Sequence, residues 1–164
     1  MNRLLHIAAL LSLVAIILMS CSDDGCTDNG SSLPLAAFYV GSTQQSVNGL
    51  KIKGIGAPGD SLLVNSSAVK EAYLPLRASV TSTSYALSRF HISGQDTTIV
   101  RDTLTISYEP VAYFHSEECG AMFNFYLNSV ISSTHGIDSV IVLTTLVTNS
   151  RTPSMRIYFT DFQQ

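Results

Sequence analysis

The side chains that could perform acid–base or nucleophilic chemistry are sparse, and three histidines are the main candidates: His91, His115 and His135. The sequence has no G-x-S-x-G motif, and no serine sits in an obvious strained turn. A Ser-His-Asp triad is defined by geometry, so spacing along the sequence does not exclude one. A carboxylate pair for glycoside cleavage is equally impossible to identify from sequence. We therefore predict no catalytic residues.

Metal binding is the second chemistry to consider. Residues 115–119 read His-Ser-Glu-Glu-Cys, but neighbours on a strand point to opposite faces, whereas a zinc site needs three or four converging ligands. His115 and Glu117 share a face, and a third ligand would have to come from elsewhere. The acidic stretch 23–30 offers oxygen ligands for calcium, yet its glycine falls one position late and no glutamate ends it. We predict solvated loops, no metal and no cofactor.

Residues 1–20 have the three parts of an export signal. Arg3 supplies the positive start, residues 7–18 form an apolar run interrupted by one serine, and the small Ser20 precedes Cys21. A spanning helix needs about 20 consecutive apolar residues, so this shorter run is typical of a signal core. The alternatives are a membrane anchor and a secretory signal that is cut at another position.

The sequence Leu18-Met19-Ser20-Cys21 resembles the lipobox of bacterial lipoproteins. In that family a leucine lies three positions before the cysteine and a small residue directly before it. Met19 departs from the pattern, which prefers a smaller residue there. The resemblance implies that Cys21 is acylated and that residues 1–20 are removed. Two or three acyl chains hold a protein on a bilayer almost permanently, so Cys21 is the predicted membrane anchor.

Ser22, Asp23 and Asp24 follow this cysteine directly. They resemble the acidic export tag of surface-exposed lipoproteins in Bacteroidetes-type bacteria. The resemblance implies an outer-membrane protein that is displayed at the cell surface rather than on the periplasmic face. The alternative is a flexible solvated tether, because Asp and Ser are common in such segments.

Once Cys21 carries lipid, Cys26 and Cys119 are the remaining cysteines. Thiols in an oxidising compartment tend to pair. A Cys26–Cys119 disulfide would close a loop of roughly 93 residues, which stabilises by about 4 to 5 kcal/mol in the chain-entropy model. Neither cysteine lies in a C-x-x-C motif, and no histidine is at ligand spacing from Cys26. We favour a structural disulfide over a zinc-binding or nucleophilic role.

The length and charge of the remaining chain limit the number of domains and the kinds of partner. Residues 21–164 are enough for one domain, which we divide into an acylated tether (21–32) and a folded domain (33–164). Eight basic residues stand against twelve acidic ones after the signal peptide, without a basic cluster. Because a nucleic-acid-binding surface needs such a cluster, we exclude nucleic acid as a partner.

The pattern after residue 31 indicates β-structure. Segments such as Leu104–Tyr108 alternate apolar and polar residues, as half-buried strands do. Glu109-Pro110 is predicted to end a strand, and the apolar run 140–143 to be a central strand. We expect strands at Leu35–Val40, Val47–Ile55, Leu62–Val64, Tyr73–Leu76, Ser84–Ile92, Thr97–Val100, Leu104–Tyr108, Met122–Leu127, Ile137–Val147 and Met155–Phe159. Short strands with such turns predict a single antiparallel β-sandwich of immunoglobulin-like or related topology.

Four segments read Asp, then Ser or Thr, then Leu, Val or Thr. They resemble the O-glycosylation sequon of Bacteroidetes envelope proteins, although the same pattern is typical of turn-to-strand junctions. The implied glycosylation sites are Ser61, Thr97, Thr103 and Ser139.

Seven tyrosines and seven phenylalanines could stack on sugar rings. The absence of Trp argues against a stacking platform, and we assign most rings to the core. A glycan-binding groove would need exposed rings, for which Tyr108, Tyr113 and Tyr126 are the candidates.

A wider resemblance covers nearly the whole chain after the signal. The order of four segments is similar to that of a small Bacteroidetes lipoprotein family of uncharacterised function, with Cys26 and Cys119 as its cysteine pair. The segments are Leu74–Leu76, Asp102–Tyr108, Glu118–Gly120 and Ile137–Val140. Because these motifs are structural, the resemblance implies no activity.

The expected function is that of an outer-membrane lipoprotein acting as a non-catalytic accessory or interaction module of the cell envelope. Its expected partners are the membrane, through Cys21, and an unknown envelope protein or glycan. The alternative is a surface module that binds glycans or host protein. An envelope hydrolase is the third and least favoured function.

Overall fold

The computed structural model describes residues 32–60, 62–93, 95–117 and 119–161. The predicted signal peptide, Cys21, the export tag at 22–24, Cys26 and Ser61 lie outside these ranges and stay predictions. Within the described ranges the chain is almost entirely β-structure. None of the helical segments found there is long and apolar enough to cross a membrane.

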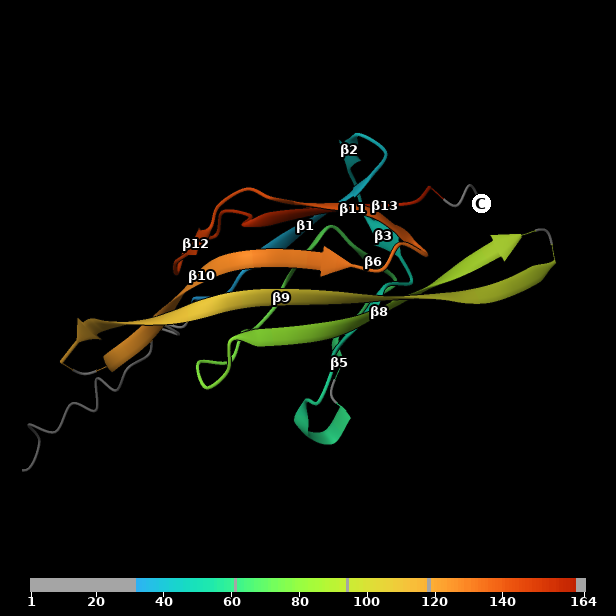
Figure 1. The fold of residues 1–164 in the computed structure, drawn as a ribbon. Coiled ribbons are helices and arrows are strands. Elements are labelled where there is room, and N and C mark those ends of the chain that lie inside the picture. Colours follow the sequence, from blue (N-terminus) through green and yellow to red (C-terminus); the bar gives the residue numbers. More distant parts are fainter. Residues whose placement is uncertain (1–31, 61, 94, 118, 162–164) are drawn as a thin grey trace, which may run out of the picture.

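The larger of two main sheets has the strand order β12-β10-β9-β8-β4-β5, and its neighbouring strands pair antiparallel. Its body is made by three long strands that two hairpins connect in sequence (Figure 1). The strands are β4 (Lys51–Gly54), β5 (Leu62–Asn65), β8 (Ser82–Ser93), β9 (Asp96–Ser116), β10 (Gly120–Ser132) and β12 (Leu146–Val147).

The smaller sheet has the order β11-β13-β1-β2, and β7 pairs with the first half of β1. Strands β1 and β13 run parallel, with Phe38 opposite Ile157. They are far apart in the sequence, so no tight hairpin forces them to be antiparallel. The strands are β1 (Leu35–Val40), β2 (Thr43–Gln44), β7 (Glu71–Tyr73), β11 (Ile137–Val142) and β13 (Met155–Phe159). Outside both sheets lie the pair β3 (Val47–Asn48) and β6 (Ala68–Val69) and the short 3-10 turn η1 (Pro58–Asp60).

One apolar core lies between the two sheets. Phe38 and Phe159 of the smaller sheet meet edge to face, with ring centroids 5.7 Å apart. Tyr108 and Phe125 of the larger sheet meet the same way at 5.4 Å. Other core side chains are Leu50, Ile52, Leu74, Tyr85, Leu87, Leu104, Ile106, Leu127, Ile137, Met155 and Ile157. The predicted β-sandwich is confirmed, and the parallel β1–β13 pair is its one departure from antiparallel pairing in the described residues.

Strand β9 overturns a predicted boundary. Glu109-Pro110 was expected to end a strand, but β9 continues through it to Ser116. The reason is that β8 begins at Ser82, opposite Ser107, so β9 has only β10 as a neighbour at Pro110. A proline is tolerated where a strand has an open side, because its missing N–H costs no bond in the sheet. The 21-residue strand is therefore about 70 Å long.

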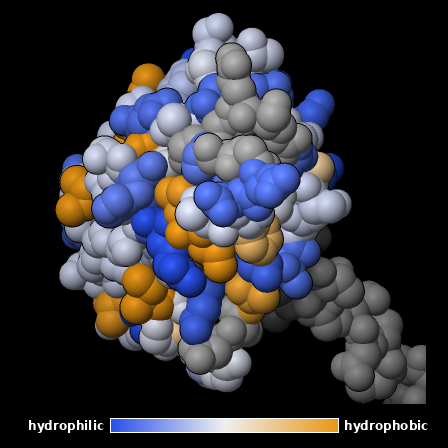
Figure 2. All heavy atoms as spheres, turned by 90° about the vertical axis from the view of Figure 1, so that its right-hand side faces the viewer, coloured by the Kyte–Doolittle hydropathy of each residue, from blue (hydrophilic) through white to orange (hydrophobic). Residues whose placement is uncertain are grey.

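The length of β9 exceeds that of the smaller sheet, and its two hairpins extend toward opposite ends of the molecule (Figure 1). One end is the turn between β8 and β9, and the other is the turn between β9 and β10. Figure 2 views the end with the β8–β9 hairpin, where hydrophobic patches are separated by hydrophilic residues.

The apolar run 140–143 was predicted to be a central strand, and this is wrong. Strand β11 lies at the edge of the smaller sheet and pairs only with β13 among the described residues. Beyond it the chain crosses to the larger sheet, where β12 pairs with β10. Val140 packs against the core, whereas Ile141, Val142 and Leu143 are exposed. The apolar residues on both faces of this strand therefore do not mean that both faces are buried, because one part of the run is exposed at the sheet edge.

Candidate functional site

Of the charged side chains that the structure describes, Asp102 alone is buried, with 6% of its surface exposed. It lies on β9 in phase with Leu104, Ile106 and Tyr108, so alternation directs all four side chains toward the smaller sheet. A carboxylate in such a place is destabilising unless hydrogen bonds satisfy it. Its partners therefore define the polar cluster of the fold.

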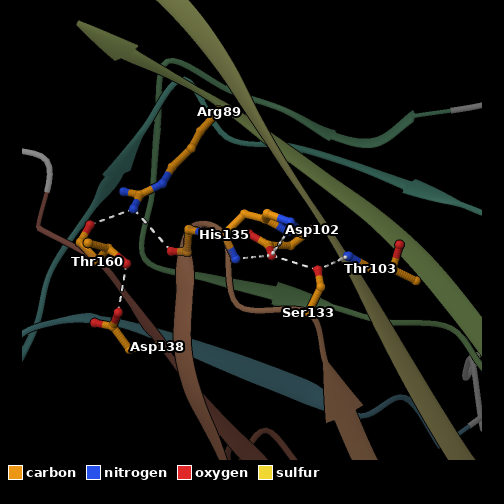
Figure 3. A network of polar contacts seen from close by, with 8 residues as sticks. Arg89, Asp102, Thr103, Ser133, His135, Asp138 and Thr160 are labelled. Carbon is orange, nitrogen blue, oxygen red and sulfur yellow. Dashed lines mark hydrogen bonds and ion pairs between the residues drawn. The ribbon is translucent and has the colours of Figure 1, made fainter. Parts of the chain in front are cut away.

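The connection between β10 and β11 surrounds this carboxylate (Figure 3). The Ser133 hydroxyl and the His135 backbone N–H donate to Oδ1 at 2.7 and 2.8 Å, and the Gly136 N–H donates to Oδ2 at 2.8 Å. Burial by itself would raise the pKa of Asp102, but these hydrogen bonds outweigh it and hold the pKa below the ordinary value. Asp102 is thus an ionised carboxylate that holds a loop.

Arg89, on β8, extends the cluster to the smaller sheet. Its guanidinium donates to the carbonyl of Gly136 at 3.1 Å and to the carbonyl of Thr160. It also lies 5.1 Å from the ring centroid of Phe159, within the range of a cation–π contact. Burial lowers the pKa of Arg89, while nearby carboxylates, Asp102 first among them, oppose that shift. The cluster therefore connects β8 and β9 to the segment after β13.

Gly136 sits where these groups converge. A Cβ atom at this position would lie 2.8 Å from Val100 Cγ1 and 3.2 Å from Asp102 Oδ2. The loop can approach β9 this closely only because residue 136 has no side chain. The Asp102 cluster, defined as Arg89, Asp102, Ser133, His135 and Gly136, is thus a tightly packed junction between the sheets.

The cluster contains the residue types of a Ser-His-Asp triad, but its geometry differs. In a triad the serine bonds to the histidine, which the aspartate orients from the other side. Here the Ser133 hydroxyl donates to Asp102 and accepts the Thr103 N–H at 3.0 Å. The His135 imidazole is 73% exposed, with Nδ1 3.4 Å from Asp102 Oδ1. This arrangement suits fixing a loop better than activating a nucleophile.

The other predicted positions are dispersed. His91 lies on β8, and His115 is exposed at the end of β9, where its ring meets that of Tyr113 edge to face at 6.0 Å. Across the described residues, no group of three His, Cys, Asp or Glu side chains converges as a metal site would. Thr97, Thr103 and Ser139 are exposed on strands. Their accessibility is compatible with glycosylation, which stays a prediction.

Tyr108 was a candidate for an exposed stacking ring, and this is wrong. It is fully buried, and its hydroxyl donates to the Arg77 carbonyl at 3.0 Å and contacts Thr83 Oγ1 at 2.7 Å. The alternation of β9 turns it to the core. Tyr126, by contrast, is exposed on β10.

A different aromatic surface lies on the outer face of the smaller sheet. Tyr39 of β1 and Tyr158 of β13 are direct neighbours in the parallel pair, with ring centroids 5.1 Å apart and a tilt of 35°. The guanidinium of Arg156 lies 5.3 Å from the Tyr39 ring centroid. Sequence analysis missed this surface, because no local signal brings β1 next to β13.

The chain enters the domain beside the β9–β10 hairpin. The Ser32 hydroxyl donates to Asn124 Oδ1 at 2.7 Å, and the Ser32 N–H donates to the Phe123 carbonyl at 3.4 Å. At the turn of the hairpin, the Cys119 N–H donates to Ser116 Oγ at 3.1 Å. Ser32 therefore bonds to β10 at residues that lie four and five positions after Cys119.

Together, these features define a two-sheet β protein whose buried carboxylate joins the sheets and which carries a pair of tyrosine rings on the outer face of the smaller sheet. A model of a family of unknown function, DUF6452, matches residues 49–159, which is more than half of the chain. The chain belongs to this uncharacterised family. Comparison with curated proteins finds no match, and comparison with solved structures finds none either.

Proposed function

We propose that the protein is an acylated outer-membrane lipoprotein whose β-sandwich is a non-catalytic accessory or interaction module of the cell envelope. The proposal of an interaction module rests on one observation: the buried charged group joins the sheets, whereas apolar and aromatic side chains are left exposed on the surface. The buried Asp102 is occupied by hydrogen bonds that join the sheets. Apolar and aromatic side chains stay exposed at the hairpin ends and on β11. Such surfaces suit an envelope protein or glycan as the partner.

The proposed attachment is through Cys21, in the lipobox-like sequence that ends the apolar N-terminal segment. Because the chain enters at Ser32, against β10, the sandwich would be held to the membrane at the end that carries the β9–β10 hairpin. The edge strand β11 and the outer faces of the sheets would stay available to partners.

The proposed Cys26–Cys119 disulfide is compatible with this entry point. Ser32 lies six positions after Cys26, and an extended chain of that length reaches about 21 Å. Phe123, whose carbonyl accepts the Ser32 N–H, lies four positions after Cys119, or about 13 Å along a strand. Cys26 can therefore reach Cys119 without any change in the sandwich, and the bridge would fix the tether to the hairpin.

The acylation test compares Cys21→Ala with Cys26→Ala after metabolic labelling with a fatty-acid analogue. The wild type and Cys26→Ala should be labelled and recovered with the outer membrane, whereas Cys21→Ala should be unlabelled and keep residues 1–20. Labelling of Cys21→Ala would contradict the proposal.

Protease accessibility on intact cells then separates surface display from the periplasmic face. If the protein is displayed at the surface, protease should digest the wild type on intact cells. The double variant Asp23→Asn, Asp24→Asn should then stay protected.

Glycan binding is the second candidate function, and the paired rings of Tyr39 and Tyr158 favour it. Rings that lie side by side on a sheet offer faces for sugar stacking, and Arg156 adds hydrogen-bond donors beside them. Titration calorimetry with a panel of soluble oligosaccharides tests this. Tyr158→Ala should abolish binding and Tyr126→Ala, on the other sheet, should keep it. Equal binding by both variants would remove this candidate.

A further inference from the structure

The end of the β9–β10 hairpin carries an aromatic face that the smaller sheet does not cover. In the register of the hairpin, Phe114 pairs with Ala121, and Phe123 and Phe125 follow on the same face of β10. Their exposure rises toward the turn, from 3% at Phe125 to 37% at Phe123 and 71% at Phe114. The face that forms the core in the middle of the sandwich thus continues into solvent at the hairpin end, which extends beyond the smaller sheet (Figure 1).

A cavity of about 250 Å³ opens beside this face. Its lining includes Leu33, Leu76, Met122 and Phe123, which are apolar, together with Ser32. Ser32 is the residue at which the chain enters the domain and bonds to β10. The aromatic face, the cavity and the entry of the tether therefore lie at one place in the fold.

We propose that this hairpin end contacts the lipid bilayer, with the ring of Phe114 in the interfacial region and Phe123 behind it. The inference rests on the proposed acylation of Cys21. Ser32 lies eleven positions after Cys21, a stretch of chain that reaches at most about 40 Å, so the acyl anchor keeps the hairpin close to the membrane surface. Apolar side chains held near a bilayer partition into its headgroup–acyl boundary.

The polar residues of the turn set the depth of this contact. Glu117 is exposed at the turn and His115 is exposed beside it. A carboxylate avoids the hydrocarbon region, so the turn stays among the headgroups. The opposite hairpin, which holds Phe90 at 49% exposure, is at the far end of β9 and points away from the membrane.

The chain has no tryptophan, so each introduced Trp is a single fluorescent reporter. The acylated protein would be placed in phosphatidylethanolamine–phosphatidylglycerol vesicles with and without brominated acyl chains. Trp emission in Phe114→Trp should shift to shorter wavelength and be quenched by the brominated lipid. Phe90→Trp is the matched control at the other hairpin and should show neither change. Phe123→Trp should show weaker quenching than Phe114→Trp.

If the protein floats with the vesicles, and is therefore anchored to them, any of three results would overturn the inference. One is unquenched emission at the aqueous wavelength in Phe114→Trp, and another is equal quenching at both hairpins. The third is a blue shift that depends on protein concentration and not on lipid, since a second copy would then cover the face. Failure of the acylation is distinct, because the wild type would then not float with the vesicles at all.

Discussion

The two hairpins share β9 but end differently. At the β8–β9 end, the side of β9 that faces the smaller sheet carries Asp102, and Arg89 of β8 joins it in a cluster bonded to the loop before β11 and to Thr160 (Figure 3). At the β9–β10 end, the same side carries Phe114, opposite Ala121. On the side that faces the smaller sheet, one end is thus held by directed hydrogen bonds, and the other carries the exposed ring of Phe114.

Strand β9 is longer than the sheet packed against it, and the fold covers its inner side near one end but leaves it exposed at the other. Hydrogen bonds to backbone groups of a loop close the sandwich at Asp102. Among the residues that the structure describes, no loop covers Phe114 in this way, and its ring stays largely in solvent. We infer that the Asp102 cluster near the β8–β9 end stabilises the fold, and that Phe114 at the β9–β10 end is available for contact with another molecule or a membrane.

Asp102→Ala should give the largest loss of stability. It leaves the Ser133 hydroxyl and the N–H groups of His135 and Gly136 without their acceptor. Breaking a buried charged network of this kind costs about 3 to 5 kcal/mol. Urea unfolding, followed by circular dichroism, measures the change. Asp96→Ala, at the exposed end of the same strand, is the matched control and should be nearly neutral. A loss below about 1 kcal/mol for Asp102→Ala would show that the cluster is not a junction.

Acid should remove the contribution of Asp102. The pKa of its carboxyl is lower in the folded protein than the value of about 3.9 expected in an unfolded chain. Its ionised form therefore adds stability that is fully present above about pH 4 and is lost as the pH falls through the folded pKa. The difference in urea midpoint between wild type and Asp102→Asn should be widest at neutral pH and should narrow in acid. A constant difference would argue against an ionised carboxylate.

Gly136→Ala should have an intermediate effect at the same end. The added methyl would lie 2.8 Å from Val100 Cγ1, so the loop or β9 must shift. Overpacking of this kind typically costs about 1 to 3 kcal/mol. Ser139→Ala, an exposed position just beyond, controls for changes in the same segment. Thermal unfolding of both variants measures the effect, and equal midpoints would show that the loop accommodates a side chain easily.

Local patterns in the sequence predict much of this fold. Leu35–Val40 is found as predicted, and the alternation of Leu104 to Tyr108 identifies a strand with one core face. Other boundaries depend on neighbours that are distant in sequence. Pro110 does not end β9 because β8 begins at Ser82, opposite Ser107, and so leaves that side of β9 open, and no local signal contains that fact.

The candidate site was harder to predict. Asp102 was considered only as part of an Asp-Thr-Leu sequon and of a segment that carries the family resemblance, although its phase with Leu104 and Ile106 indicates an inward carboxylate. That phase is the signal that would have found it. The partners of Asp102 come from a loop about thirty residues away, so they could not be identified in advance. The Tyr39–Tyr158 pair likewise depends on a long-range parallel contact.

Phe114→Ser should give the smallest change in stability, and this sharpens the contrast between the hairpins. A ring that is 71% exposed has little contact to lose, so the free energy of unfolding should change by no more than about 0.5 kcal/mol. Phe125→Ala, on the same face but in the core, should cost about 3 to 5 kcal/mol. Urea unfolding of the two variants without lipid makes the comparison. A large loss for Phe114→Ser would mean that the ring packs within the domain, and the aromatic end would then serve the fold instead of its surroundings.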